Sequence, residues 1–240
     1  IRDRLYLASS SEVYQTPNRI PTDENESLKI PDIYNPRFSY GGGKILLEDT
    51  YTNGDNDFSA QLARLKALDE EPDVIFISSY GVDIALITKT LREAGITAPV
   101  LGGDSYDDPG VWEALGAKFG SDVYFVTHTW MQGTEGHPDM PEFVKLYTDY
   151  HGSAPDTAFV ATGWDTVMLF AQAAEIAGTT DGAAVAKALE DNEFNLLTGD
   201  LDYSNAADGH YPYKAAALVA LNEGNPSFLG WRNPENPPAP

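Results

Sequence analysis

The sequence contains no cysteine, has few basic residues and has no long hydrophobic run. The absence of cysteine excludes disulfide bonds, cysteine-ligated zinc, iron–sulfur clusters and thiol nucleophiles. Only 15 lysines and arginines face 37 aspartates and glutamates, which gives a formal net charge of −22. An acidic chain of this kind repels a phosphate backbone, so we expect no nucleic-acid partner. The short hydrophobic runs also predict no direct insertion into a membrane.

What remains is a composition typical of a folded protein. Hydrophobic residues make up 42% and aromatic residues 11% of the 240 positions, enough for one large domain or two small ones. The chain starts at Ile1 with no leader-like segment before it. We therefore expect either that a leader was removed or that the chain is a fragment.

The acidic charge is concentrated after residue 46. Residues 1–46 hold six basic and six acidic side chains, whereas the remaining 194 residues hold 9 basic and 31 acidic ones. This step suggests two segments of different origin; a chance clustering of surface carboxylates is the alternative. The acidic part suits a salty environment, where a hydrated anionic surface keeps a protein in solution.

From residue 45 onward, short apolar runs alternate with amphipathic stretches. The runs predict strands at 45–47, 73–78, 99–101 and 123–126, and the stretches between them predict helices at 58–68, 82–94 and 109–119. Such alternation predicts an α/β fold with a parallel sheet and right-handed crossovers. Beyond it we expect helices at 140–150, 158–177 and 182–191, strands at 196–203 and 213–222, and a proline-rich tail at 233–240.

Five phrases in this order and spacing resemble a type I periplasmic solute-binding protein of an ABC transporter, of the branched-chain amino-acid-binding (Leu-binding) type. They are residues 50–62, 72–76, 91–96, 101–104 and 163–165. The resemblance covers 47–240 and implies an incomplete parallel-sheet lobe of that fold, mainly the C-terminal lobe. It further implies a non-catalytic, cofactor-free receptor that is periplasmic or otherwise extracytoplasmic. Such a receptor binds an amino acid or similar small solute and delivers it to a transporter permease.

Ligands of open parallel sheets bind at the carboxyl ends of the strands. Two such ends carry Ser79-Tyr80 and Gly103-Asp104. The resemblance implies that Tyr80 touches the ligand and that Asp104 pairs with an α-ammonium group, a charge-assisted contact, while Gly103 allows close approach. Two alternatives stay open: Asp104 caps the turn before the helix at Pro109, and Tyr80 is a packed core ring.

The family has two lobes, and most of the first lobe has no counterpart here. The first strand and helix of the second lobe have none either, and the hydroxyl and backbone groups that normally hold the ligand carboxylate belong to the part without a counterpart. In the family, the helices near Met140 and Ala158 belong to the first lobe. We therefore expect these helices to expose apolar faces unless residues 1–46 or another chain cover them.

Residues 1–46 resemble a different family, the extended short-chain dehydrogenases of the NAD-dependent sugar-nucleotide epimerase/dehydratase type. The resemblance rests on the phrase 9–14 and on Tyr40 and Lys44, which match that family's Tyr-x-x-x-Lys, with Ser10 as the serine partner. The nucleotide-binding glycine loop is missing, so we expect these residues to be chemically idle. We interpret the chain as a chimera joined near Gly42-Gly43-Lys44.

Two hypotheses of function follow. The first is a non-catalytic solute receptor, and the alternative is a remnant of the NAD-dependent enzyme. Four scattered histidines form no metal-binding pair. The acidic stretch 200–209 has some features of a calcium loop but fits a hairpin turn better.

Overall fold

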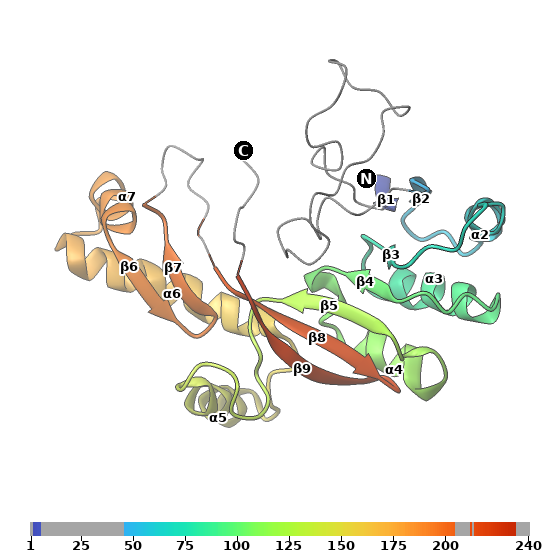
Figure 1. Cartoon of the computed structure of the whole chain (residues 1–240). Coiled ribbons are helices and arrows are strands. Elements are labelled where there is room, and N and C mark those ends of the chain that lie inside the picture. The colour runs from blue at the N-terminus through green and yellow to red at the C-terminus, as the bar shows by residue number, and fades with distance from the viewer. Residues whose placement is uncertain (1, 6–45, 205–211, 213, 234–240) are drawn as a thin grey trace, which may run out of the picture.

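The computed structural model of the chain describes residues 2–5, 46–204, 212 and 214–233 (Figure 1). Its centre is a five-stranded sheet in the order β3-β4-β5-β8-β9. The strands are β3 (Ile75–Phe76), β4 (Val100–Gly102), β5 (Val123–Thr127), β8 (Ala216–Asn222) and β9 (Asn225–Arg232). The predicted α/β fold and parallel sheet are confirmed for β3, β4 and β5.

The last two strands run antiparallel to their neighbours, which the sequence analysis did not predict. They form a hairpin whose two-residue turn, Glu223-Gly224, has positive φ at both positions. Turns of this kind match the twist of antiparallel strands, so the chain reverses here without a crossover helix.

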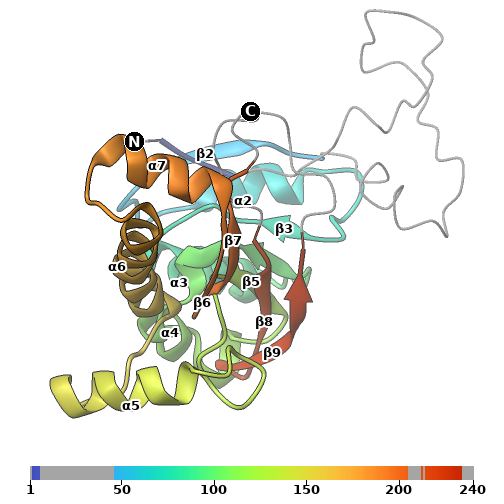
Figure 2. The ribbon, with the colours of Figure 1, turned by 90° about the vertical axis from the view of Figure 1, so that its left-hand side faces the viewer.

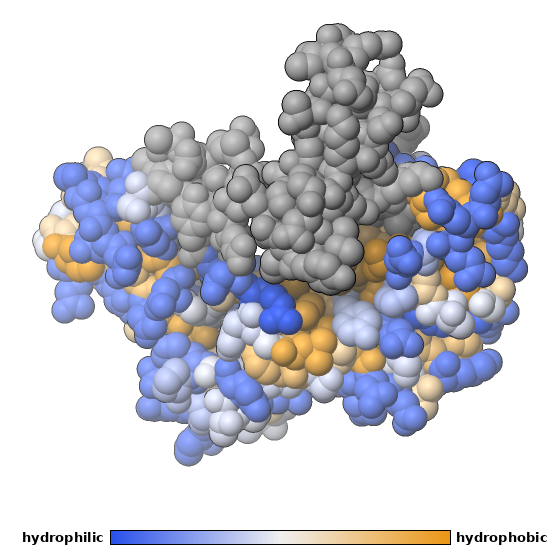
Figure 3. All heavy atoms as spheres, in the orientation of Figure 1, coloured by the Kyte–Doolittle hydropathy of each residue, from blue (hydrophilic) through white to orange (hydrophobic). Residues whose placement is uncertain are grey.

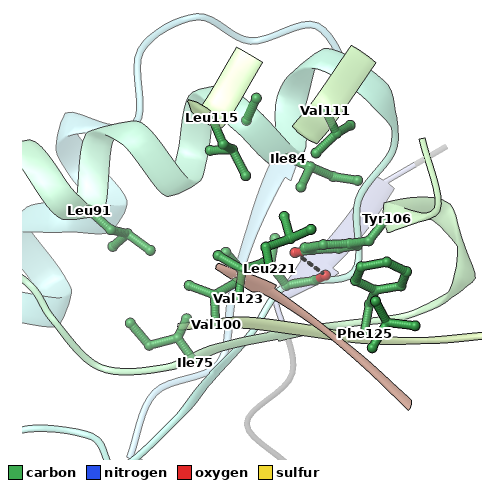
Figure 4. Close-up of a cluster of buried hydrophobic side chains, with 13 residues drawn as sticks. Ile75, Ile84, Leu91, Val100, Tyr106, Val111, Leu115, Val123, Phe125 and Leu221 are labelled. Atoms are coloured by element: carbon green, nitrogen blue, oxygen red, sulfur yellow. Dashed lines mark hydrogen bonds between the residues drawn. The ribbon is translucent and has the colours of Figure 1, made fainter. Parts of the chain in front are cut away.

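Two helices, α3 (Gly81–Glu93) and α4 (Pro109–Phe119), cover one face of the sheet, as Figure 2 shows. The core lies between them and the strands (Figure 4). Along β5 every second residue is buried and the residues between are half-buried, so one face of the sheet is sealed and the other partly open. The core is aliphatic around Ile84, Val100 and Leu115, and aromatic around Tyr106 and Phe125.

A second layer of structure follows β5 in the chain and lies to the left in Figure 1. It contains the helices α5 (Met140–His151), α6 (Ala158–Ala177) and α7 (Gly182–Asp191), and a hairpin of β6 (Glu193–Leu196) and β7 (Gly199–Asp202). The hairpin packs on α6 and α7 through Ala173, Val185 and Phe194. The predicted single strand at 196–203 is therefore wrong: Leu197 and Thr198 form a turn between two strands.

The first strand predicted after the N-terminal segment is shifted and does not join the main sheet. Strand β2 (Asp49–Thr52) pairs antiparallel with β1 (Arg2–Leu5), and the helix α2 (Ser59–Lys66) follows it. Tyr51 of β2 nevertheless reaches the main sheet, because its hydroxyl donates a 2.5 Å hydrogen bond to Ser79 Oγ in the loop after β3.

The helices α5 and α6 expose apolar side chains, as the sequence analysis predicts. The exposed residues are Leu146 and Tyr150 on α5, and Phe159, Trp164, Val167, Phe170 and Ile176 on α6. Figure 3 shows another hydrophobic area in the middle of the molecule around β5 and β8, with hydrophilic residues over most of the periphery. Among the residues that the structure describes, no helix combines the length and apolarity that crossing a membrane requires.

Candidate functional site

A cleft of about 580 Å³ opens where the carboxyl ends of β4 and β5 face α6, the β6–β7 hairpin and the segment before β8. Its lining contains both polar and apolar residues. The polar and charged residues include Asp104, Thr127, His128, Asp165, Tyr203 and Lys214, and the apolar ones include Val126, Leu169 and Leu201. A cleft of this size and mixed lining suits a small molecule.

Asp104 lies at the mouth of this cleft, in the short 3₁₀ helix η2 (Asp104–Tyr106) that follows β4. Its side chain is 50% exposed, and its Oδ2 lies 3.1 Å from Nε2 of His128 at the end of β5. The capping alternative is wrong, because the N-cap of η2 is Gly103 and the N-cap of α4 is Asp108, which accepts a 2.7 Å hydrogen bond from the Gly110 N–H. Asp104 is thus an accessible carboxylate that a neighbouring imidazole orients.

The two glycines before Asp104 have different roles. A Cβ on Gly102 would lie 2.0 Å from the ring of Tyr106, whose hydroxyl donates a 3.1 Å hydrogen bond to the Ile77 carbonyl (Figure 4). Gly102 therefore makes room for a buried ring. A Cβ on Gly103 would meet no atom within 4 Å, and its φ of −89° is open to any residue. Gly103 borders open space in the cleft.

The structure joins the two predicted loops but separates their side chains. The Ser105 hydroxyl donates a 2.6 Å hydrogen bond to the Ser79 carbonyl, so the loops after β3 and β4 are in direct contact. Ser79 itself is only 2% exposed and is bonded to Tyr51. Tyr80 is 63% exposed, so the core-ring alternative is wrong. Neither residue lines the cleft that Asp104 and Gly103 border.

Sequence reasoning missed Asp107, which connects the sheet to α6. Its buried Oδ2 accepts hydrogen bonds from Thr127 Oγ1 at 2.7 Å and from the Ala158 N–H, in the first turn of α6, at 2.9 Å. Burial raises the pKa of Asp107, and these two hydrogen bonds oppose the rise. This carboxylate fixes one wall of the cleft against another.

Asp165 performs a similar task for the β6–β7 hairpin. From the middle of α6 its two carboxylate oxygens accept the N–H groups of Leu197 and Thr198, at 3.0 and 2.8 Å. The hydroxyl of Thr129 also donates to the Leu197 carbonyl, at 3.2 Å. The turn of the hairpin is thereby held in place beside the cleft. Asp165 belongs to the sequence phrase 163–165, but nothing in that phrase indicates that its side chain binds the turn at Leu197 and Thr198.

Lys214 was not among the predicted residues either. It stands just before β8 and lines the cleft together with Asp104. Burial lowers its pKa from 10.5 to about 8, and the charge of Asp165 partly opposes this. An isolated lysine in a turn-rich segment gives no sequence signal, because only the tertiary fold brings it to the ends of β4 and β5.

The remaining predictions concern the dehydrogenase-like residues and the suspected calcium loop. Ser10, Tyr40 and Lys44 lie outside the described residues, as does most of the stretch 205–212. Asp200 and Asp202 lie on β7 and accept hydrogen bonds from Asn195 and Ser204. Within the described part of the chain, no group of three or more histidines and carboxylates is placed to hold a metal ion.

A parallel sheet with a cleft at the carboxyl ends of its strands places the chain in the class of α/β proteins that bind small molecules at that edge. A model of the periplasmic binding protein family matches residues 37–226. The chain therefore belongs to this family, which consists of solute-binding proteins rather than enzymes. The match begins before residue 46, and the separate origin of 1–46 stays a prediction.

Particular relatives narrow the comparison. Leu/Ile/Val-binding protein homolog 3 of Brucella melitensis is 29% identical over 181 residues, covering 75% of this chain and 47% of the relative. Homolog 1 of Brucella suis is 30% identical over 172 residues, covering 71% and 44%. The chain spans about half the length of the curated relatives it matches.

Solved structures of other binding proteins also match the fold of this chain. The leucine-binding protein LivK of Thermotoga maritima superposes with a TM-score of 0.64 at 30% identity, covering 76% of this chain and 50% of that one. LivJ of Streptococcus pneumoniae, solved with isoleucine, superposes with a TM-score of 0.64 at 24% identity, covering 77% and 51%. The second likeness concerns the fold alone.

Proposed function

We propose that this chain is the ligand-binding part of the substrate-binding component of an ABC transporter. It binds a branched-chain amino acid or a similar small solute outside the cytoplasm and delivers it to a membrane permease. The observation that carries this proposal is the accessible Asp104 carboxylate at the mouth of a cleft formed by the ends of β4 and β5. The relatives named for leucine, isoleucine and valine support the solute class.

The chemistry of the cleft suits such a ligand. Asp104 accepts hydrogen bonds from the α-ammonium group, and charge-assisted bonds of this kind are about twice as strong as neutral ones. His128 holds the carboxylate in its orientation. Val126, Leu169 and Leu201, from β5, α6 and β7, offer apolar contacts to an aliphatic side chain.

Tyr80, Ser79 and Gly103 keep supporting roles in this proposal. Ser79 ties the loop after β3 to the Asp104 loop through Ser105. Tyr80 presents an exposed ring on that same loop. Gly103 leaves the space beside Asp104 open.

The test is calorimetric titration of the chain with leucine, isoleucine and valine, with NAD as the ligand of the alternative function. We expect binding of at least one amino acid and none of NAD. Asp104→Asn should weaken amino-acid binding about 10- to 100-fold, because it removes a charged acceptor of similar shape. Asp149→Asn, on the exposed side of α5, is the matched control and should change nothing.

Two results would contradict the proposal. Binding of NAD without any amino acid would favour the enzyme remnant. Unchanged affinity in Asp104→Asn would remove this carboxylate from the site, even if the chain binds leucine.

A further inference from the structure

Lys214 brings a positive charge into the cleft. Among the described residues that line it, Lys214 is the single lysine or arginine. The other charged or titratable groups of the lining are Asp104 and His128 at the strand ends, Asp165 on α6, and Tyr203 after β7. The cleft thus offers both acceptors of hydrogen bonds and one cationic donor.

The fold provides a seat for the stem of this lysine. A Cβ on Gly199 would lie 3.9 Å from Lys214 Cε and 4.0 Å from its Cγ. The stem therefore packs over the backbone of Gly199, the first residue of β7. Gly199 has a φ of +118°, which disfavours residues with a side chain. At these distances a Cβ would make only ordinary van der Waals contact, so the aliphatic stem lies directly beside the backbone of Gly199.

The seat is itself held firmly. Gly199 directly follows Leu197 and Thr198, whose N–H groups both bond to the buried Asp165 carboxylate. The lysine thus rests on a turn anchored to α6, not on a freely moving loop. An ammonium group positioned in this way is pre-organised for a ligand, which reduces the entropy lost on binding.

Asp165 does not fully compensate the charge of Lys214. Both of its oxygens already accept backbone hydrogen bonds, and the ammonium remains disfavoured by burial. A partly buried cation without a complete counter-charge costs stability. An anionic group that enters the cleft would provide the missing charge.

We propose that Lys214 binds the carboxylate of the ligand, while Asp104 takes its ammonium group. The cleft then selects free amino acids, which carry both charges, over amines, amides and simple carboxylic acids. This inference rests on the proposed function and adds the residue that recognises the second charge.

The test compares four ligands of one shape: leucine, leucinamide, 3-methylbutylamine and 4-methylpentanoate. Calorimetric titrations use the whole chain and its variants Lys214→Met and Asp104→Asn. Lys214→Met should weaken leucine binding about 10- to 100-fold and leave leucinamide unchanged, because only leucine has the carboxylate. Asp104→Asn should weaken leucine and leucinamide but spare 4-methylpentanoate.

Controls separate recognition from folding. Lys145→Met removes an exposed lysine of α5 and should leave all four affinities unchanged. Lys214→Arg keeps the charge and should retain preference for leucine over leucinamide. Thermal unfolding of each variant verifies that the chain is folded.

Each outcome has a defined meaning. Equal weakening of leucine and leucinamide in Lys214→Met would overturn the proposal in favour of a structural role, and so would unchanged leucine affinity. If the unmodified chain binds 4-methylpentanoate and leucine with equal affinity, the proposed role of Asp104 is overturned and that of Lys214 is supported. If it binds none of the four, the proposed function itself is overturned.

Discussion

At the scale of single residues, charge burial explains the side chains that sequence reasoning missed. Asp107 and Asp165 are buried carboxylates: Oδ2 of Asp107 accepts hydrogen bonds from a hydroxyl and a backbone N–H, and both oxygens of Asp165 accept backbone N–H groups. Lys214 is the exception, because burial disfavours its charged form more than the negative charge of Asp165 favours it. A residue that destabilises its own fold is a candidate for function, since its benefit must lie elsewhere.

This cost predicts a pH-dependent gain in stability for Lys214→Met. The folded pKa of Lys214 is about 8 against an ordinary value of 10.5. Between these values the unfolded chain holds more protons, so stability rises with pH there, and below pH 8 the full cost is present. At pH 7 the variant should therefore be more stable by about 1–2 kcal/mol, after allowance for solvent screening.

Urea unfolding of both proteins at pH 7 and pH 10 would measure this gain, which should shrink at the higher pH. The titratable groups that line the cleft together with the lysine are Asp104, His128, Asp165 and Tyr203. Loss of stability at pH 7 would show that Asp165 compensates the ammonium fully.

At the scale of secondary-structure elements, α6 organises the site. Its N-terminus is bound by Asp107 from the sheet, and its middle binds the β6–β7 turn through Asp165. The helix therefore links the strand ends, where Asp104 and His128 lie, to the turn on which Lys214 rests. The relative position of the two proposed charge-binding residues depends on this helix.

We predict that Asp165→Ala detaches the hairpin from α6. The substitution leaves two buried N–H groups without acceptors, which should cost about 2–4 kcal/mol of unfolding free energy. Hydrogen exchange should rise first at Leu197 and Thr198. Asp200→Ala, on the exposed side of the same hairpin, should change stability by less than about 0.5 kcal/mol.

The elements themselves were largely predictable where their ends carry strong signals. The helix predicted at 109–119 is found at Pro109–Phe119, because a proline opens it after the capping Asp108. Strand β9 was missed, because Pro226 and Gly230 interrupt its pattern. An edge strand tolerates both residues, since its outer side forms no ladder.

The site was predictable only in part. Asp104 and Gly103 follow a recognisable strand, and the structure places both at the cleft. Ser79 and Tyr80 follow the neighbouring strand but do not line the cleft. The Ser79 hydroxyl is bonded to Tyr51, and Tyr80 stands at the start of α3. Lys214 and Asp165 line the same cleft only through long-range packing, which no local pattern encodes.

At the scale of the whole molecule, two features of the surface oppose each other. The net charge of −22 favours dispersed molecules. The exposed apolar residues of α5 and α6 favour contact with other surfaces. Salt screens the repulsion among the carboxylates, both between molecules and within one molecule, but does not weaken apolar contacts.

We therefore predict that the melting temperature rises with ionic strength. Between 0.05 and 1 M KCl the screening length falls to about 3 Å, so repulsion among surface carboxylates is largely removed. Calorimetric scans at several salt concentrations should show an increase of several degrees. A melting temperature independent of salt would mean that the carboxylates are too well separated to repel one another.

The open space beside Gly103 has a practical consequence. Because the chain has no cysteine of its own, Gly103→Cys would create a unique thiol facing the cleft, at a backbone angle that accepts a side chain. An environment-sensitive dye attached there would report on any solute that enters the cleft, and would test the proposed ligands by fluorescence without calorimetry.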